Sequence, residues 1–88
     1  MNIVILGSGH VATTLSQVFT NHGHRIQQVY SRTEANAKAL AFAVGSPYIT
    51  AVELLDSHAD LYFIAVSDQA IGELVELMPP TLQGTVVH

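Results

Sequence analysis

Strand-like and helix-like patterns of apolar residues alternate from one end of the chain to the other. Nearly continuous apolar runs at residues 3–6 and 61–66 are typical of strands buried on both faces of a parallel sheet. Weaker strand signals lie at residues 25–30, 48–49 and 85–88. Three stripes of apolar residues recur at helical spacing: Val11, Leu15, Val18 and Phe19; Ala37, Leu40, Ala41 and Val44; and Ile71, Leu74, Val75 and Met78.

Turn and capping residues separate these segments. Helix-ending residues follow the three stripes: Gly23, then Gly45 with Pro47, then Pro79-Pro80. Asp68 is placed to cap the third helix, and residues 51–55 predict one or two further helical turns. Strands and helices therefore alternate, which predicts a parallel sheet with helices on both faces. Because such crossovers are right-handed, the expected order of the five strands is 3-2-1-4-5.

A glycine-rich turn joins the first strand to the first helix, with the sequence Gly-Ser-Gly-His-Val-Ala at residues 7–12. Gly7 permits a tight turn, Gly9 lets the backbone approach a pyrophosphate, and Ala12 lets the helix pack closely on the sheet. The free N–H groups and the positive end of the helix then face the anion. We therefore expect a doubly wound, Rossmann-type α/β domain over residues 1–88. Its loop and first helical turn supply the candidate nucleotide-binding residues Gly7, Ser8, Gly9, His10, Val11 and Ala12.

The end of the second strand favours NADP over NAD. NAD-binding domains place an Asp or Glu there to hold the ribose 2′-hydroxyl. This chain has Ser31, Arg32 and Thr33 instead, which offer one guanidinium and two hydroxyls to a 2′-phosphate. A second interpretation stays open, in which Ser31 and Glu34 form a capping box for the second helix and Glu34 pairs with Lys38 on its surface. Both can hold, because capping leaves Arg32 available.

The end of the fourth strand carries further candidates, because ligands of open α/β sheets bind beyond the carboxyl ends of the strands. Ala65 and Val66 offer backbone and apolar surface to a cofactor, and Ser67 and Asp68 offer polar groups. Asp68 is equally well explained as a helix cap. Elsewhere, the His10 side chain is placed to reach phosphate or substrate, and His88 at the end of the last strand is a weaker candidate to approach the nicotinamide.

Three motifs together resemble a known family: residues 7–12, Tyr-Ser-Arg-Thr at 30–33, and Ile-Ala-Val-Ser-Asp-Gln-Ala-Ile at 64–71. They are similar to the N-terminal Rossmann domain of pyrroline-5-carboxylate reductase-like proteins, most of all to a bacterial branch of NADP oxidoreductases. The resemblance implies that the cofactor lies across the strand ends and that residues 65–68 line it. It also implies a helical C-terminal domain that supplies most substrate contacts and the interface of a homodimer.

Composition narrows the remaining classes of function. Net charge is −4 with only three Lys and Arg residues, which argues against a nucleic-acid partner. The chain has no cysteine, and its five histidines form no recognised metal-ligand pair; His22 and His24 are better explained as a solvated helix end. No apolar run is long enough for a membrane span, so we expect a cytoplasmic protein. Only 11% of residues are charged, against about 25% in typical domains, so we expect apolar surface that something else covers.

These observations predict the NADP-binding domain of an oxidoreductase, which transfers a hydride to or from a C=N or C=O substrate. We expect residues 1–88 to be the N-terminal part of a longer protein, able to bind the cofactor but inactive alone. A non-catalytic module that senses a nucleotide stays open, because a glycine fingerprint reports binding and not reaction. The sequence identifies no catalytic residue and no substrate.

Overall fold

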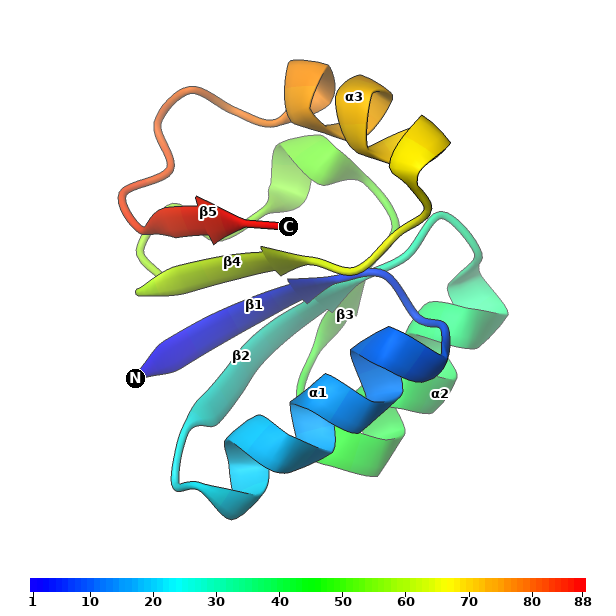
Figure 1. The fold of residues 1–88 in the computed structure, drawn as a ribbon, viewed down its shortest axis with the longest axis vertical. Coiled ribbons are helices and arrows are strands. Elements are labelled where there is room, and N and C mark those ends of the chain that lie inside the picture. The colour runs from blue at the N-terminus through cyan, green and yellow to red at the C-terminus, as the bar shows by residue number, and fades with distance from the viewer.

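The computed structural model describes the backbone of residues 1–88 and every side chain except that of Asp68. A five-stranded parallel sheet runs in the order β3-β2-β1-β4-β5 (Figure 1). Its strands are β1 (Asn2–Leu6), β2 (Arg25–Tyr30), β3 (Tyr48–Ile49), β4 (Leu61–Ile64) and β5 (Thr85–Val87). The predicted Rossmann-like α/β class and strand order are confirmed.

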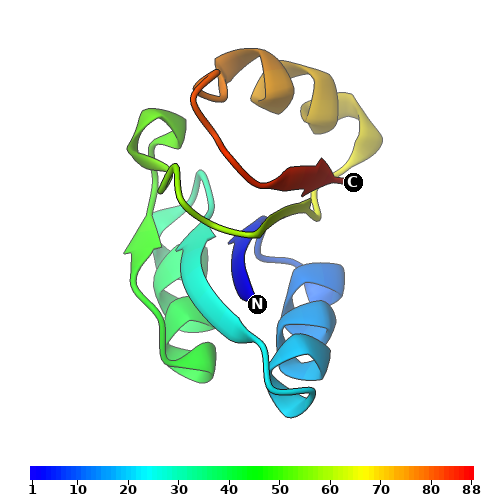
Figure 2. The ribbon, with the colours of Figure 1, turned by 90° about the vertical axis from the view of Figure 1, so that its left-hand side faces the viewer.

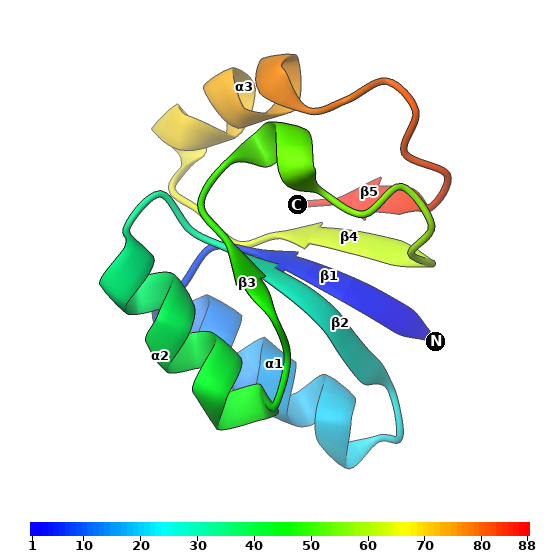
Figure 3. The same ribbon diagram turned by 180° about the vertical axis from the view of Figure 1, so that it is seen from behind.

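Helices cover both faces of the sheet (Figure 2). The elements are α1 (His10–Asn21), α2 (Glu34–Val44), the 3-10 turn η1 (Val52–Leu54) and α3 (Asp68–Leu77). Helices α1 and α2 lie on one face, whereas η1 and α3 lie on the other (Figure 3). The chain winds outward from β1 to β3, returns to the centre and then continues to β4 and β5. The strand order therefore reverses between β1 and β4, which is where ligands of such folds bind.

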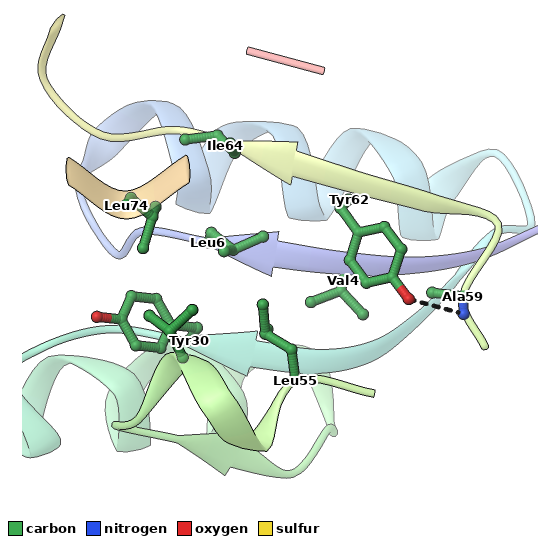
Figure 4. Packing of buried hydrophobic residues seen from close by; sticks show 9 residues of the cluster. Val4, Leu6, Tyr30, Leu55, Ala59, Tyr62, Ile64 and Leu74 are labelled. Atoms are coloured by element: carbon green, nitrogen blue, oxygen red, sulfur yellow. Dashed lines mark hydrogen bonds between the residues drawn. The ribbon is translucent and has the colours of Figure 1, made fainter. Parts of the chain in front are cut away.

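Strand β1 forms the centre of the core. Ile3 and Ile5 are fully buried and pack among residues of α1, α2 and β2. Val4 and Leu6 point to the opposite face, where they pack in a cluster with Tyr62 of β4 and with residues of η1 and α3 (Figure 4). This alternation is the period of two that a strand imposes, with both faces covered as a central parallel strand requires.

Helix α1 packs on the sheet along one side of the predicted apolar stripe. Phe19 packs against the core, and Ala12 is fully buried, as its predicted close approach to the sheet requires. The buried residues are Ala12 and Ser16, whereas Val11 is 60% exposed and Val18 is 42% exposed. Small residues on the inner face let the helix approach β1 closely, and the Ser16 hydroxyl is satisfied because its Oγ donates to the Ala12 carbonyl oxygen at 2.6 Å. The apolar spacing was that of a helix, but it wrongly placed Val11 and Val18 on the side that packs on the sheet.

Two predicted helix caps are also wrong. Helix α3 begins at Asp68 itself, so Ser67 occupies the N-cap position; the side chain of Asp68 lies outside the described part of the structure. Helix α2 has Thr33 at its N-cap, two residues later than the capping box required. Ser31 Oγ accepts a hydrogen bond from the Thr33 N–H at 3.3 Å, which forms a local turn before the helix. Glu34 accepts from the Tyr48 hydroxyl at 3.3 Å between O atoms.

A buried side-chain amide on β2 connects the sheet to the last residue of η1 and to the segment that follows it. Gln28 is 5% exposed, and its Nε2 donates to the Leu54 carbonyl oxygen at 3.2 Å. Its Oε1 accepts from the Asp56 N–H at 3.0 Å. Nearby, the Ala59 N–H donates to the Tyr62 hydroxyl oxygen at 3.2 Å (Figure 4). These bonds satisfy polar groups that would otherwise be costly to bury.

Candidate nucleotide-binding site

Three loops meet where the strand order reverses. The Gly7 N–H donates to the Tyr30 carbonyl oxygen at 2.8 Å, which joins the end of β1 to the end of β2. On the other side, the Ala65 N–H donates to the Leu6 carbonyl oxygen at 2.7 Å and joins β1 to the end of β4. The glycine turn therefore lies between the loop that carries Arg32 and the loop after β4. This is the crevice at which dinucleotides bind in doubly wound sheets.

A cleft of about 330 Å³ opens between these loops. It is lined by Gly7, Ser8, Gly9, Tyr30, Ser31, Arg32, Thr33, Asn36, Ala65, Val66, Ser67 and Ala70. The structure thus brings the glycine turn, the serine–arginine–threonine segment and residues 65–67 around one space, as the sequence predicted. None of the described residues that line this cleft is acidic.

The two positions of the turn favour glycine for different structural reasons. Gly7 has a φ of +129°, and a β-carbon there would collide with the Ala65 carbonyl oxygen. Gly9 has an ordinary φ of −79°, and a β-carbon there would meet no atom within 4 Å. Gly9 is exposed and carries no side chain that could cap α1, whose first turn contains no acidic residue. The N–H groups at the start of α1 are therefore open to an anion in the cleft.

The loop after β2 presents one exposed cation beside a buried hydroxyl. Arg32 is exposed at the cleft, whereas Ser31 is only 7% exposed. Ser31 Oγ lies 3.0 Å from Ser8 Oγ, so a hydrogen bond connects the glycine turn to the loop that carries the arginine. Asn36, which the sequence analysis missed, lines the same cleft from the first turn of α2. The sequence analysis placed the helix cap at Ser31, so it gave no signal for Asn36.

A smaller cavity of about 140 Å³ adjoins this cleft between the end of β2 and α3. Its walls are mostly apolar, and it shares Tyr30, Arg32, Val66 and Ala70 with the cleft. Arg32 and Glu73 are its charged lining residues, and Leu74 and Leu77 of α3 belong to its apolar wall. Burial raises the pKa of the Tyr30 phenol, and the nearby Arg32 charge opposes that rise. Tyr30 therefore borders the cavity as a neutral hydroxyl at neutral pH.

A third cleft, of about 610 Å³, lies on the other side of the glycine turn. His10 and Val11 line it from α1, Phe63 lines it from β4, and His88 lines it after β5. Gly9 and residues 65–67 border both this cleft and the first one. The structure thus places both histidines suggested by the sequence around one space. Ala12 lines neither cleft, because it is fully buried on the side of α1 that faces the sheet.

The described residues offer little to other classes of ligand. They contain no group of three or more His, Asp or Glu side chains that could hold a metal ion. His22 is an exposed residue at the end of α1, with its Nδ1 2.8 Å from the Val18 carbonyl oxygen. In the same described part of the chain, the helices are too short or too polar to cross a membrane.

Comparison with a family model identifies the domain. Residues 2–87 match the model of the family described as coenzyme F420-dependent NADP oxidoreductase. The chain belongs to this family. The resemblance inferred from the three sequence motifs is thereby confirmed, because the match runs through all of them and the observed fold agrees with it.

Solved structures show the same domain within longer proteins. A candidate NADP oxidoreductase from Bacteroides fragilis is 35% identical, with a TM-score of 0.88 over 97% of this chain and 33% of its own. Biliverdin reductase from Synechocystis, solved with biliverdin and NADP+, is 23% identical, with a TM-score of 0.80 over 98% of this chain and 28% of its own. An imine reductase from Streptomyces aurantiacus is 20% identical, with a TM-score of 0.77 over 99% of this chain and 30% of its own.

The similarities to the biliverdin reductase and to the imine reductase show only that the fold is shared. This NADP oxidoreductase-family chain spans about one third of the length of the Bacteroides protein. A comparison with curated protein sequences gave no match.

Proposed function

We propose that this domain binds NADP(H) with preference over NAD(H), as the cofactor-binding part of an oxidoreductase. One observation carries the proposal: a single cleft joins the open start of α1 to Arg32, without an acidic side chain among its described lining residues. A carboxylate at the end of β2 would repel a 2′-phosphate, whereas a guanidinium binds one through charge-assisted hydrogen bonds. Membership of an NADP oxidoreductase family supports the same assignment.

The residues present fit each part of the dinucleotide. The pyrophosphate would lie against the N–H groups at the start of α1, where Gly9 leaves room. Ser31, Arg32 and Thr33 would hold the 2′-phosphate, and the apolar cavity beside Tyr30 would take the adenine ring. The nicotinamide half would then extend past residues 65–67 into the cleft that His10 and His88 line. Asp68, the first residue of α3, follows Ser67 along this path.

The bound nicotinamide would supply or accept the hydride, and the protein would orient the ring and exclude water. We propose a reductase or dehydrogenase that acts on a C=N or C=O group. Because the Bacteroides protein is about three times as long, we propose that further polypeptide supplies substrate contacts and a homodimer interface, and that residues 1–88 alone bind without turnover.

The test is a calorimetric titration of the full-length protein with NADPH and with NADH. We expect tighter binding of NADPH, by about tenfold or more, because one or more charge-assisted hydrogen bonds are made only to the 2′-phosphate. Equal affinities would contradict the cofactor assignment. Oxidation of NADPH by an imine, a carbonyl compound or coenzyme F420 would support the enzyme. Tight binding without turnover on any of these would instead favour a nucleotide-sensing module.

A further inference from the structure

We propose that Glu73 of α3 is a specificity-determining residue, which selects adenine by accepting a hydrogen bond from the exocyclic amino group of the base. The proposal rests on the NADP-binding function above and deepens it, because it concerns the base and not the 2′-phosphate. Apolar walls hold a flat ring of suitable size, but they do not distinguish adenine from another purine. That distinction requires a polar group at a defined place in the site.

Glu73 lies at the end of the small cavity that is farther from the glycine turn. The cavity and the larger cleft share four lining residues, which are Tyr30, Arg32, Val66 and Ala70. Glu73, Leu74 and Leu77 border the cavity but not the cleft. A base whose ribose lies in the cleft would therefore meet these three residues with the edge that is farthest from its ribose.

The spacing of residues along α3 brings Glu73 to the cavity wall. Ala70, Leu74 and Leu77 recur at intervals of four and three residues, so they lie on one face of the helix. Glu73 follows Ala70 by three residues and precedes Leu77 by four, which places it beside the same face. Leu74 is 7% exposed, whereas Glu73 is exposed. The leucine therefore packs inward, while the carboxylate stays in contact with water and avoids the cost of burying a charge.

The chemistry of Glu73 matches the far edge of adenine. The amino group on C6 of adenine donates hydrogen bonds, and an ionised carboxylate only accepts them. Arg32 is the other charged residue among the described lining of the cavity, and a guanidinium only donates. The Tyr30 hydroxyl can accept, but Tyr30 also borders the cleft and so lies nearer the ribose. Glu73 is therefore the acceptor at the place where the amino group would lie.

The experiment compares the binding of NADPH with that of its analogue in which purine replaces adenine, so that only the amino group is missing. Calorimetry on the full-length protein gives the two dissociation constants. We expect NADPH to bind about three- to tenfold more tightly, because the analogue lacks one charge-assisted hydrogen bond and water at the exposed carboxylate replaces part of it. Glu73→Ala should bring this ratio close to one. Glu73→Gln should keep part of the preference, because its amide oxygen still accepts.

Glu76→Ala is the matched control. Glu76 is an exposed carboxylate on the same helix, and it does not line the cavity. Its removal changes the net charge by the same amount, so it reproduces any general gain in affinity for an anionic cofactor. The ratio between NADPH and the analogue should stay at the wild-type value. Alanine is the best helix former, and thermal unfolding of each variant checks that the fold is retained.

The outcomes separate this proposal from the function on which it rests. A wild-type protein that binds neither NADPH nor the analogue would contradict the NADP-binding function itself. Tight and equal binding of both would overturn only the role of Glu73, as would a preference for NADPH that survives Glu73→Ala or is lost equally in Glu76→Ala. A preference that disappears in Tyr30→Phe but persists in Glu73→Ala would assign the amino group to the tyrosine instead.

Discussion

Gly7 lies so close to Ala65 that a β-carbon at Gly7 would collide with the main-chain carbonyl oxygen of Ala65. The glycine turn after β1 is therefore packed directly against the loop after β4, with no side chain between them. The sequence explained Gly7 by the tightness of its turn. The structure adds a second requirement, which comes from a loop far away along the chain, and this requirement separates Gly7 from Gly9.

Substituting the two glycines one at a time should separate an effect on the stability of the fold from an effect on cofactor binding. Gly7→Ala places a side chain against backbone at a φ of +129°, so we expect a loss of about 2 kcal/mol or more in the free energy of unfolding. Gly9→Ala has an ordinary backbone conformation and open space, so it should change that free energy by less than about 0.5 kcal/mol. Its methyl group would instead obstruct the pyrophosphate. Urea unfolding and NADPH titration measure the two effects.

The Gly9→Ala variant also serves as the control for Gly7→Ala. If Gly9→Ala bound NADPH as tightly as the wild type, the pyrophosphate would not lie against this turn. A Gly7→Ala variant of unchanged stability would mean that the two loops can separate at little cost.

Replacement of Arg32 should change which cofactor binds more tightly. Arg32→Ala removes the exposed guanidinium at the 2′-phosphate position, so NADPH affinity should fall about ten- to a hundredfold while NADH affinity stays within about twofold. Arg25→Ala is the matched control, because it removes an exposed arginine from the opposite end of the same strand. Calorimetry at two salt concentrations checks the result. A parallel loss with both cofactors would place Arg32 at the pyrophosphate instead.

The features predicted correctly are those that depend on local pattern. Strand order follows from the alternation of elements and from crossover handedness, and the glycine turn follows from residues adjacent in sequence. The convergence of Arg32 with the turn follows from parallel strands, whose carboxyl ends meet at one edge. These relations need no knowledge of side-chain packing.

The features predicted wrongly depend on which surfaces meet. Helix α1 buried Ser16 beside the predicted Ala12 and left Val11 and Val18 exposed, because close approach to β1 outweighed the larger apolar area of the two valines. The caps of α2 and α3 shifted because helix starts are set by the loops that carry them. The cavity beside Tyr30 requires the distance between β2 and α3, which no local pattern contains.

The side-chain amide of Gln28 should stabilise the fold, although it is a polar group in a buried position. Gln28→Ala leaves the Leu54 carbonyl and the Asp56 N–H without their side-chain partner, so we expect a loss of about 1–3 kcal/mol in the free energy of unfolding. Gln17→Ala, on the exposed side of α1, is the matched control and should stay within about 0.5 kcal/mol. Urea unfolding compares them. Equal stabilities would mean that water replaces the lost bonds.

Ionisation of Tyr30 offers a measure of the field at the cofactor site. Burial raises the pKa of its phenol above the ordinary value of about 10, and the Arg32 charge acts against this rise. The unfolded chain therefore ionises first. The contribution of the Tyr30 phenol to the free energy of unfolding is complete below about pH 10. It is lost as the pH rises through the higher pKa of the folded state. A Tyr30→Phe variant should lose less stability than the wild type over that alkaline range.

The same phenol should report the removal of Arg32 directly. Arg32→Ala takes away the positive charge that favours the phenolate, so the pKa of Tyr30 should move further upward, whereas Arg25→Ala should leave it in place. The measurement is a titration of phenolate ultraviolet absorbance, with Tyr30→Phe subtracted to isolate this residue. A downward shift in Arg32→Ala would mean that the substitution admits water to the phenol, and that burial depends on the arginine side chain itself. An unchanged pKa would place the guanidinium too far from Tyr30 for the two to border one cavity, and the proposed seat of the adenine ring would then be wrong.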